Sequence, residues 1–249
     1  MRWQPANLEP LSRRFERQHP REALRWGLTT YGHAIVLATG FGPSGIVLMH
    51  LASQLRPETT VFYLQTDLLF PETMALRDRL AERLGIRFTE VRPDLSLEKQ
   101  AMLYRPELWQ SNPDLCCHLR KVEPLRRFLA GKKAWISAIR RDQSPTRTSV
   151  KVVDWDRANQ LVKISPLAGW KRDQVWDYLR AYDLPYNPLH DQGFASIGCF
   201  PCTGANSGEG ERSGRWPGTG KLECGIHIQP GGKIVRLADS EPASGGLRH

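Results

Sequence analysis

The feature that most restricts the fold of this chain is the alternation of short β-type runs with helical stretches in its first half. The apolar run at 34–38 precedes a helical stretch at 46–55, the run at 60–64 precedes a helix after Pro71, and 86–91 is a third such run. This order is typical of a parallel sheet with helices on both faces. The sequence therefore predicts an α/β fold with a doubly wound, mostly parallel sheet.

The remaining elements are predicted from the same patterns. One or two amphipathic helices interrupted near Pro20 are expected over 7–31, a helix over 118–130, a strand over 134–139, a hairpin of 150–153 with 160–164, and a helix over 171–182.

The C-terminal part of the chain has a different composition. The segment GANSGEGERSGRWPGTG begins at Gly204, and its glycines make regular structure costly. We expect one domain over 1–228 that includes a mobile arm at 204–228, and a loosely ordered tail at 229–249.

Charge and hydropathy limit the partners and the cellular compartment that are expected for this protein. The formal net charge of +9 indicates an anionic partner, which could be a nucleotide, a nucleic acid or an acidic protein surface, but a basic surface without such a role fits equally well. The first twenty residues lack an apolar signal core, and no apolar run is long enough to span a membrane. We expect a cytoplasmic protein whose thiols stay reduced.

A glycine-rich turn, TGFGPSG, covers residues 39–45 between the first strand and its helix. Backbone N–H groups in such a turn, together with the helix N-terminus, can hold phosphate or sulfate. Gly40, Gly42 and Ser44 are the candidate contacts. The turn matches neither the dinucleotide nor the Walker pattern, and a tight connection without a ligand is the alternative.

Five cysteines form an adjacent pair, Cys116 and Cys117, a CxxC pair, Cys199 and Cys202, and the single Cys224. Two pairs brought together by the fold would supply four thiolates, which suit zinc or an iron–sulfur cluster. Neighbouring cysteines diverge, and this favours a [4Fe–4S] cluster over a single zinc ion. The remaining cysteine lies in KLECGIH near basic residues, where a thiol can become nucleophilic, unless it is merely an exposed thiol.

Several strings occur in an order that resembles the assimilatory sulfonucleotide reductases, and the cysteine set resembles their adenylyl-sulfate reductase branch. The resemblance covers about residues 34–228. The strings are CCHLRKVEPL at 116–125, RRDQSPTR at 140–147, SPLAGW at 165–170, LPYNPLHDQGFASIGCFPCT at 184–203, and ERSGRW followed by KLECGIH.

The resemblance implies an adenine-nucleotide α-hydrolase-like fold and a thioredoxin-dependent enzyme of sulfate assimilation. It implies that the four paired cysteines hold a [4Fe–4S] cluster and that Cys224 is the nucleophile. It places Lys121 between cluster and substrate and assigns Arg147, Arg212 and Arg215 to the phosphosulfate. The loop at 39–45 matches the family's nucleotide loop, although it lacks the acidic residue common there.

The expected reaction is attack of the Cys224 thiolate on the sulfur of adenylyl sulfate (APS). AMP leaves, and thioredoxin or a similar dithiol then frees sulfite from the cysteine S-sulfonate. The alternatives are a reductase of 3′-phosphoadenylyl sulfate (PAPS) or of both nucleotides, a tRNA-thiolating enzyme, and a zinc-bound nucleic-acid-binding module. We expect neither a nucleic-acid nor a membrane partner.

Overall fold

The computed structural model describes residues 7–206, 208 and 210–227, so the predicted loosely ordered tail at 229–249 lies outside the described residues. Six strands form one sheet in the order β3-β2-β1-β4-β6-β5. They are β1 (Ile35–Ala38), β2 (Thr60–Leu64), β3 (Phe88–Val91), β4 (Ala134–Ile136), β5 (Val153–Asp156) and β6 (Leu161–Ile164). All pairings are parallel except that of β5 with β6, which confirms the predicted α/β class.

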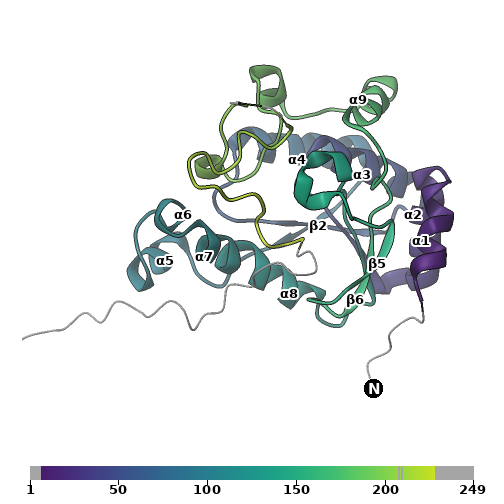
Figure 1. The fold of residues 1–249 in the computed structure, drawn as a ribbon, viewed down its shortest axis with the longest axis horizontal. Helices are drawn as coiled ribbons and strands as arrows, with labels where there is room; N and C mark the ends of the chain where they lie inside the picture. Colours follow the sequence, from purple (N-terminus) through teal and green to yellow (C-terminus); the bar gives the residue numbers. More distant parts are fainter. Residues whose placement is uncertain (1–6, 207, 209, 228–249) are drawn as a thin grey trace, which may run out of the picture.

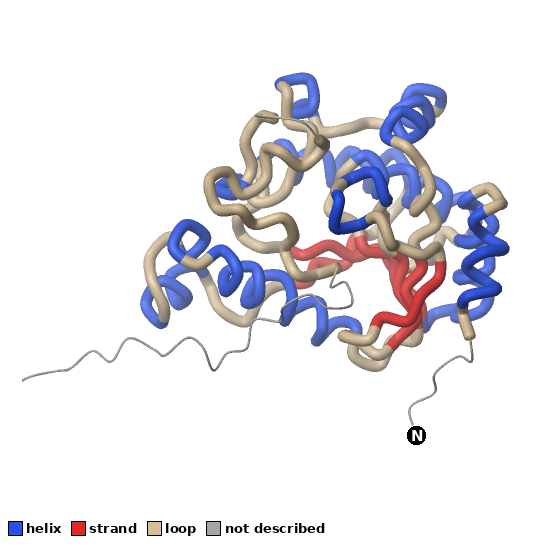
Figure 2. The backbone as a smooth tube through the Cα atoms, in the orientation of Figure 1, coloured by secondary structure: helices blue, strands red, loops and turns tan. Residues whose placement is uncertain are grey.

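Helices cover both faces of this sheet (Figures 1 and 2). They are α1 (Glu9–Glu16), α2 (Pro20–Tyr31), α3 (Pro43–Leu55), α4 (Pro71–Leu84), α5 (Leu97–Leu103), α6 (Leu108–Ser111), α7 (Pro113–Cys117), α8 (Glu123–Leu129) and α9 (Arg172–Ala181). In the view of Figure 1, α3 and α4 lie above the sheet and α8 lies below it.

Local sequence explains several helix ends. Pro20 begins α2, because proline needs no N–H partner in the first turn, and the side chain of His19 caps this helix by accepting from the Arg21 N–H at 3.2 Å. Gly85 ends α4 in the left-handed conformation, at φ 63°, that glycine adopts without strain. The predicted break near Pro20 is therefore confirmed.

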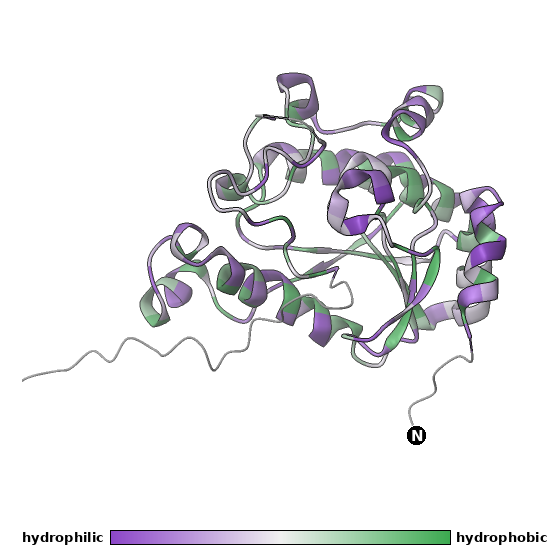
Figure 3. Ribbon diagram, in the orientation of Figure 1, coloured by the Kyte–Doolittle hydropathy of each residue, from purple (hydrophilic) through white to green (hydrophobic). Residues whose placement is uncertain are grey.

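Alternation along the strands divides the hydrophobic core into two layers. Figure 3 shows hydrophobic residues along the strands and on the helices that cover them. Ile35 and Leu37 of β1 pack with residues of α2, α3, α4 and α9, whereas Val36 packs with Phe62, Trp135 and the α8 residues on the other face. Successive strand side chains point to opposite faces, so a strand that is apolar throughout needs cover on both. The second face is also covered by Ile226 of the C-terminal segment.

Some boundaries differ from the predictions. The hairpin pairs 153–156 with 161–164 instead of 150–153 with 160–164, β4 ends at Ile136, and α3 begins at Pro43. The helices α5, α6 and α7 were not expected, because helices of seven, four and five residues are too short to show a helical period. Within the described residues, no helix has the length and apolar content needed to cross a bilayer.

The sheet reverses its winding direction between β1 and β4. The chain moves from β1 outward to β2 and β3, then returns so that β4 pairs with the other side of β1. In open α/β sheets, ligands bind in the crevice at the carboxyl ends of the strands at such a reversal. This point of the fold is therefore where a binding site is expected.

Candidate active site

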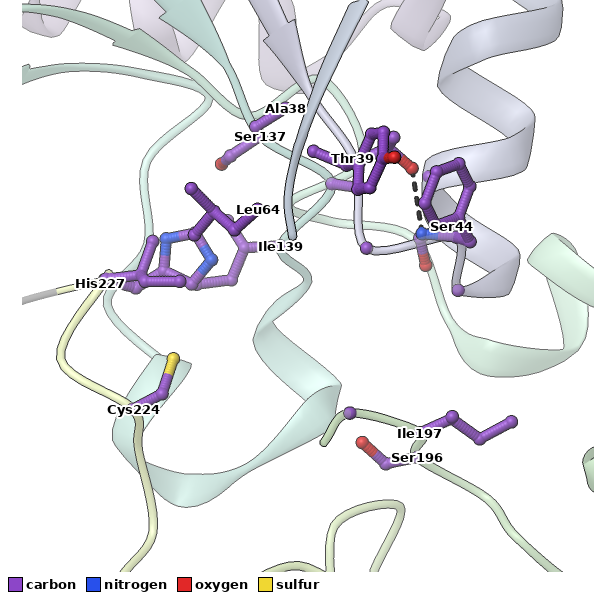
Figure 4. Close-up of a pocket in the computed structure, with 18 of the residues that line it drawn as sticks. Ala38, Thr39, Ser44, Leu64, Ser137, Ile139, Ser196, Ile197, Cys224 and His227 are labelled. Atoms are coloured by element: carbon purple, nitrogen blue, oxygen red, sulfur yellow. Dashed lines mark hydrogen bonds between the residues drawn. The ribbon is translucent and has the colours of Figure 1, made fainter. Parts of the chain in front are cut away.

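A cavity of about 270 Å³ lies at this reversal. It is lined by the segment after β1, from Ala38 to Gly45, by the segment after β4, from Ser137 to Ile139, and by residues of the C-terminal arm. Cys224 and His227 enter it from the arm, opposite Thr39 and Ser44 (Figure 4). The structure thus brings the predicted loop and the predicted nucleophile to one cavity.

The loop after β1 is held by a side chain that the sequence argument passed over. Phe41 has φ 58°, its N–H donates to Thr39 Oγ1 at 3.0 Å, and its buried ring packs on Tyr63 and Phe88. A Cβ atom added at Gly40 or Gly42 would meet nothing within 4 Å. Both glycines therefore leave their backbone open to the cavity, as an anion-binding turn requires.

Ser44 makes a hydrogen bond beyond the turn. It lines the cavity, but it is buried and its Oγ accepts a hydrogen bond from the Arg140 guanidinium. Arg140 also pairs with Glu211 of the arm. Ser44 therefore joins the glycine-rich turn to the arm through Arg140.

The four paired cysteines gather next to this cavity. Cys117 ends α7, and it packs with Cys199, Cys202 and the buried Trp216 in one cluster, against which Cys224 also packs. Cys116 lies in the adjoining cluster with Leu108, Leu115 and Leu119. All four side chains are buried.

Burial opposes ionisation of the Cys116, Cys117 and Cys202 thiols. Burial, reinforced by the neighbouring thiols, raises the pKa of Cys116 to about 12, and burial raises the pKa of Cys117 to about 11. Burial also raises the pKa of Cys202. Four buried sulfur donors are the ligand chemistry of a thiophilic metal group. Among the residues that the structure describes, no group of three or more His, Cys, Asp or Glu side chains is arranged to hold a metal ion.

Two cations follow the adjacent cysteines within one π-helical turn, His118–Val122. The buried guanidinium of Arg120 donates to the Thr66 carbonyl and pairs with Asp67. Lys121 instead lines the cavity. Burial would lower the pKa of Lys121, but the negative charge of Cys199, Cys117 and Cys224 as thiolates outweighs burial and raises this pKa above its usual value.

Cys224 lies where a thiolate is stabilised. Burial alone would raise the pKa of its thiol, but Lys121, the Ile226 backbone N–H and Arg212 together hold the pKa below its usual value. Figure 4 shows its sulfur directed from the arm into the cavity. A thiolate, and not a thiol, is the nucleophilic form of cysteine.

Trp216 organises the cations of the arm, and sequence reasoning missed it. Its buried ring lies 4.6 Å from the Arg215 guanidinium, 5.4 Å from that of Arg212 and 5.5 Å from Lys221 Nζ. A cation placed above the face of an aromatic ring is attracted to it. The spacing Arg-x-x-Arg-Trp was the signal available in the sequence.

The three predicted arginines differ in their hydrogen bonds. Arg212 and Arg215 line the cavity. Burial lowers the pKa of Arg212 to about 10. The Nε of Arg212 has no hydrogen-bond partner within the described part of the chain. Arg147 also lines the cavity, but its nitrogens donate to Glu223 and Gln143. Sequence reasoning missed Glu223, for which its position beside Cys224 was the only signal.

His227 stacks on Trp135, with ring centroids 5.7 Å apart and planes at 15°. Its Nδ1 accepts from the Lys163 ammonium at 3.1 Å, because an ammonium group has only donors. Burial, followed by the charge of Lys163, lowers the pKa of His227 well below its usual value. A neutral His227 thus carries its proton on Nε2.

Fold and site together define an α/β protein whose cavity, at the carboxyl ends of parallel strands, is lined by a glycine-rich turn, buried cations and a cysteine. Residues 34–205 match the phosphoadenosine phosphosulfate reductase domain family. The chain therefore belongs to this family.

Relatives extend the similarity over most of the chain. The chain is 50% identical over 230 residues to adenosine 5′-phosphosulfate reductase of Salinibacter ruber, and the matched region covers 92% of this chain and 91% of the relative. It is 46% identical over 224 residues to phosphoadenosine 5′-phosphosulfate reductase of Gloeobacter violaceus, with 88% and 93% covered.

A solved structure agrees with this assignment. The crystal structure of phosphoadenylyl-sulfate reductase from Candida auris in complex with phosphate has a TM-score of 0.71 and 28% identity, and it covers 81% of this chain and 98% of that one. This likeness confirms the predicted adenine-nucleotide α-hydrolase-like fold.

Proposed function

We propose that the protein is an oxidoreductase of sulfate assimilation that reduces APS to sulfite and AMP, with a dithiol such as thioredoxin as reductant. The observation that carries this proposal is the position of Cys224, whose thiol has a lowered pKa and lies in the same cavity as the glycine-rich turn. The names of relatives that are 42–50% identical support the substrate class.

The first step is displacement at sulfur. The Cys224 thiolate attacks the sulfur of APS, an S–S bond forms, the bond from sulfur to the phosphate oxygen breaks, and AMP leaves with the electron pair. An anionic nucleophile here approaches an anionic group, so cations must offset the repulsion. Lys121, Arg212 and Arg215 line the cavity beside Cys224 and are suited to that role.

The second step transfers two electrons from the dithiol. One thiolate attacks Cys224 Sγ and expels sulfite, and the second resolves the mixed disulfide, which returns the Cys224 thiol and leaves an oxidised dithiol. This step requires the arm at 204–228 to open, as we predict from its glycines. We place the enzyme in the cytoplasm, where such dithiols are kept reduced.

We assign Cys116, Cys117, Cys199 and Cys202 to a [4Fe–4S] cluster. The support is the chemistry of the donor set, four buried thiols from two segments that the fold brings together, with buried Arg120 and Lys121 close by. When bound, the cluster supplies charge and rigidity beside the substrate, and the electrons come from the dithiol. Lys121 lines the cavity, and its charge interacts with Cys199, Cys117 and Cys224, which supports a role between the cluster and the substrate.

PAPS is the second candidate substrate, because the Gloeobacter violaceus relative and the Candida auris structure are both named for it. The two nucleotides differ only in the 3′-phosphate of the ribose. A comparison of kcat/KM for sulfite release from APS and from PAPS decides between them, and we expect APS to be preferred.

The activity is tested with purified protein, APS and reduced thioredoxin. We expect sulfite and AMP in equal amounts, and we expect Cys224→Ser to bind nucleotide but to release no sulfite. Sulfite formation by Cys224→Ser at an undiminished rate would contradict the proposed nucleophile.

A further inference from the structure

The arm that carries Cys224 is fastened by the residue next to it. The Glu223 carboxylate accepts from Arg147 Nε at 2.7 Å and Nη2 at 2.8 Å, and from the Thr146 hydroxyl at 2.9 Å. The Ser144 hydroxyl adds a longer contact at 3.3 Å. Both partners of the ion pair are largely buried, with side-chain exposures of 8% for Arg147 and 18% for Glu223.

Paired hydrogen bonds of this kind fix the orientation of both groups. A guanidinium that binds a carboxylate through two nitrogens holds it in one plane, and burial strengthens each bond. The third nitrogen of Arg147, Nη1, donates to Gln143 Oε1. All three nitrogens of Arg147 therefore already donate to protein oxygens in this state.

The opposite end of the arm is fastened to the same loop. Glu211 pairs with Arg140 and accepts a weaker contact from Gln143 at 3.4 Å, and Arg140 also donates to Ser44 of the nucleotide loop. The loop at 140–147 is thus in contact with the nucleotide loop on one side and with both ends of the arm on the other.

We propose that Glu223 is a positioning residue, which holds the arm closed through Arg147 and Thr146 and so directs the adjacent Cys224 thiol into the cavity. The inference rests on the proposed function for its effect on rate. It also adds a role for Arg147, which lines the cavity and fastens the arm through Glu223, while Arg212 makes a longer contact of 3.4 Å with the same carboxylate.

Two other roles for Glu223 fit the contacts less well. As a general base for Cys224 it would need a raised pKa, but the hydrogen bond from Arg147 and the charges of Arg147 and Arg212 overcome burial and lower it. As a placeholder for the substrate anion it would compete with the nucleotide, and its removal would then tighten nucleotide binding.

The test uses Glu223→Gln, which keeps the shape of the side chain and removes its charge, with Glu82→Gln on the exposed surface of α4 as matched control. Displacing a reacting group by ~1 Å costs about 100-fold in rate, so we expect kcat to fall by roughly that factor. The Kd for AMP should stay within about threefold, because the glycine-rich turn, Lys121 and Arg215 make no contact with Glu223 and are unchanged. The control should match the wild type in both.

Arm opening is measured without turnover, by the rate at which a bulky maleimide labels Cys224, located by peptide mass spectrometry. We expect labelling of Glu223→Gln to be about tenfold faster, equivalent to ~1.4 kcal/mol lost from the closed state. Arg147→Gln should accelerate labelling similarly, and the double variant should add little, because both changes remove one interaction. Thr146→Val, which removes a single hydroxyl donor, should give a smaller increase and serves if Glu223→Gln does not fold.

Three results would overturn the inference: unchanged labelling and kcat, additive effects of the two substitutions, or AMP binding tightened by more than about tenfold, which would indicate the placeholder role. If wild-type protein forms no sulfite, the proposed function fails, while the labelling result still decides whether Glu223 holds the arm.

Discussion

Gly198 lies under the guanidinium of Arg215, directly before Cys199. A Cβ atom at this position would lie 2.2 Å from Nη2 and 2.6 Å from Cζ of Arg215, whereas ordinary contact begins at 3.4 Å. In Gly198→Ala the guanidinium must therefore retreat by about 1.2 Å, and it does so by side-chain rotation at a cost of order 1 kcal/mol. The fold should survive while Arg215 is displaced from the cavity.

The expected effect on catalysis follows from that displacement. A ~1 Å misplacement of a group that binds the transition state costs about 100-fold, equivalent to ~2.7 kcal/mol. We expect kcat/KM for sulfite release from APS to fall by this factor, with the visible absorbance of the protein unchanged. Gly169→Ala is the control, because its nearest neighbour would be Arg141 Nη1 at 3.8 Å. A kcat/KM within threefold of wild type would refute the assignment of Arg215 to the phosphosulfate.

Three further substitutions test the cysteine cluster and its cations. Cys116→Ser should lose iron and visible absorbance, and metal analysis that finds iron unchanged would contradict the ligand assignment. Lys121→Met removes the largest influence that lowers the pKa of Cys224, so the midpoint of its alkylation with pH should rise and less thiolate should remain at neutral pH. An unchanged midpoint would contradict this electrostatic role. Arg120→Met leaves the Thr66 carbonyl without its buried donor, while Asp67 keeps its ion pair with Arg92. It should lower the free energy of unfolding by about 1–3 kcal/mol in urea denaturation, and an unchanged free energy of unfolding would show that these contacts contribute little.

Much of the fold could be predicted because its patterns are local. A strand that is buried on both faces is a continuous apolar run. In β1, Val36 packs into one core layer, and its neighbours Ile35 and Leu37 pack into the other. The segment from α5 to α7 could not be predicted in this way. Its short helices are defined by their packing around Leu108, Leu115 and Cys116, which depends on contacts distant in sequence.

The site was predictable where chemistry depends on residue type alone. Two cysteine pairs and one further cysteine indicated four gathered thiols and a separate thiol, and the structure places all five in adjoining clusters beside the cavity. The roles of Ser44 and Glu223 depend instead on partners far along the chain, Arg140 and Arg147. Neither pairing has a local signal, because the partners are 96 and 76 residues apart in sequence and share no period or spacing.

The most direct test of the account is the mass of the peptide that contains Cys224 after incubation of the protein with APS in the absence of any dithiol. The account predicts that this peptide gains the mass of one SO₃ group, that one AMP is released per adduct, and that reduced thioredoxin removes the adduct as sulfite. Release of sulfite with no adduct on Cys224, or an adduct on one of the other four cysteines, would contradict it.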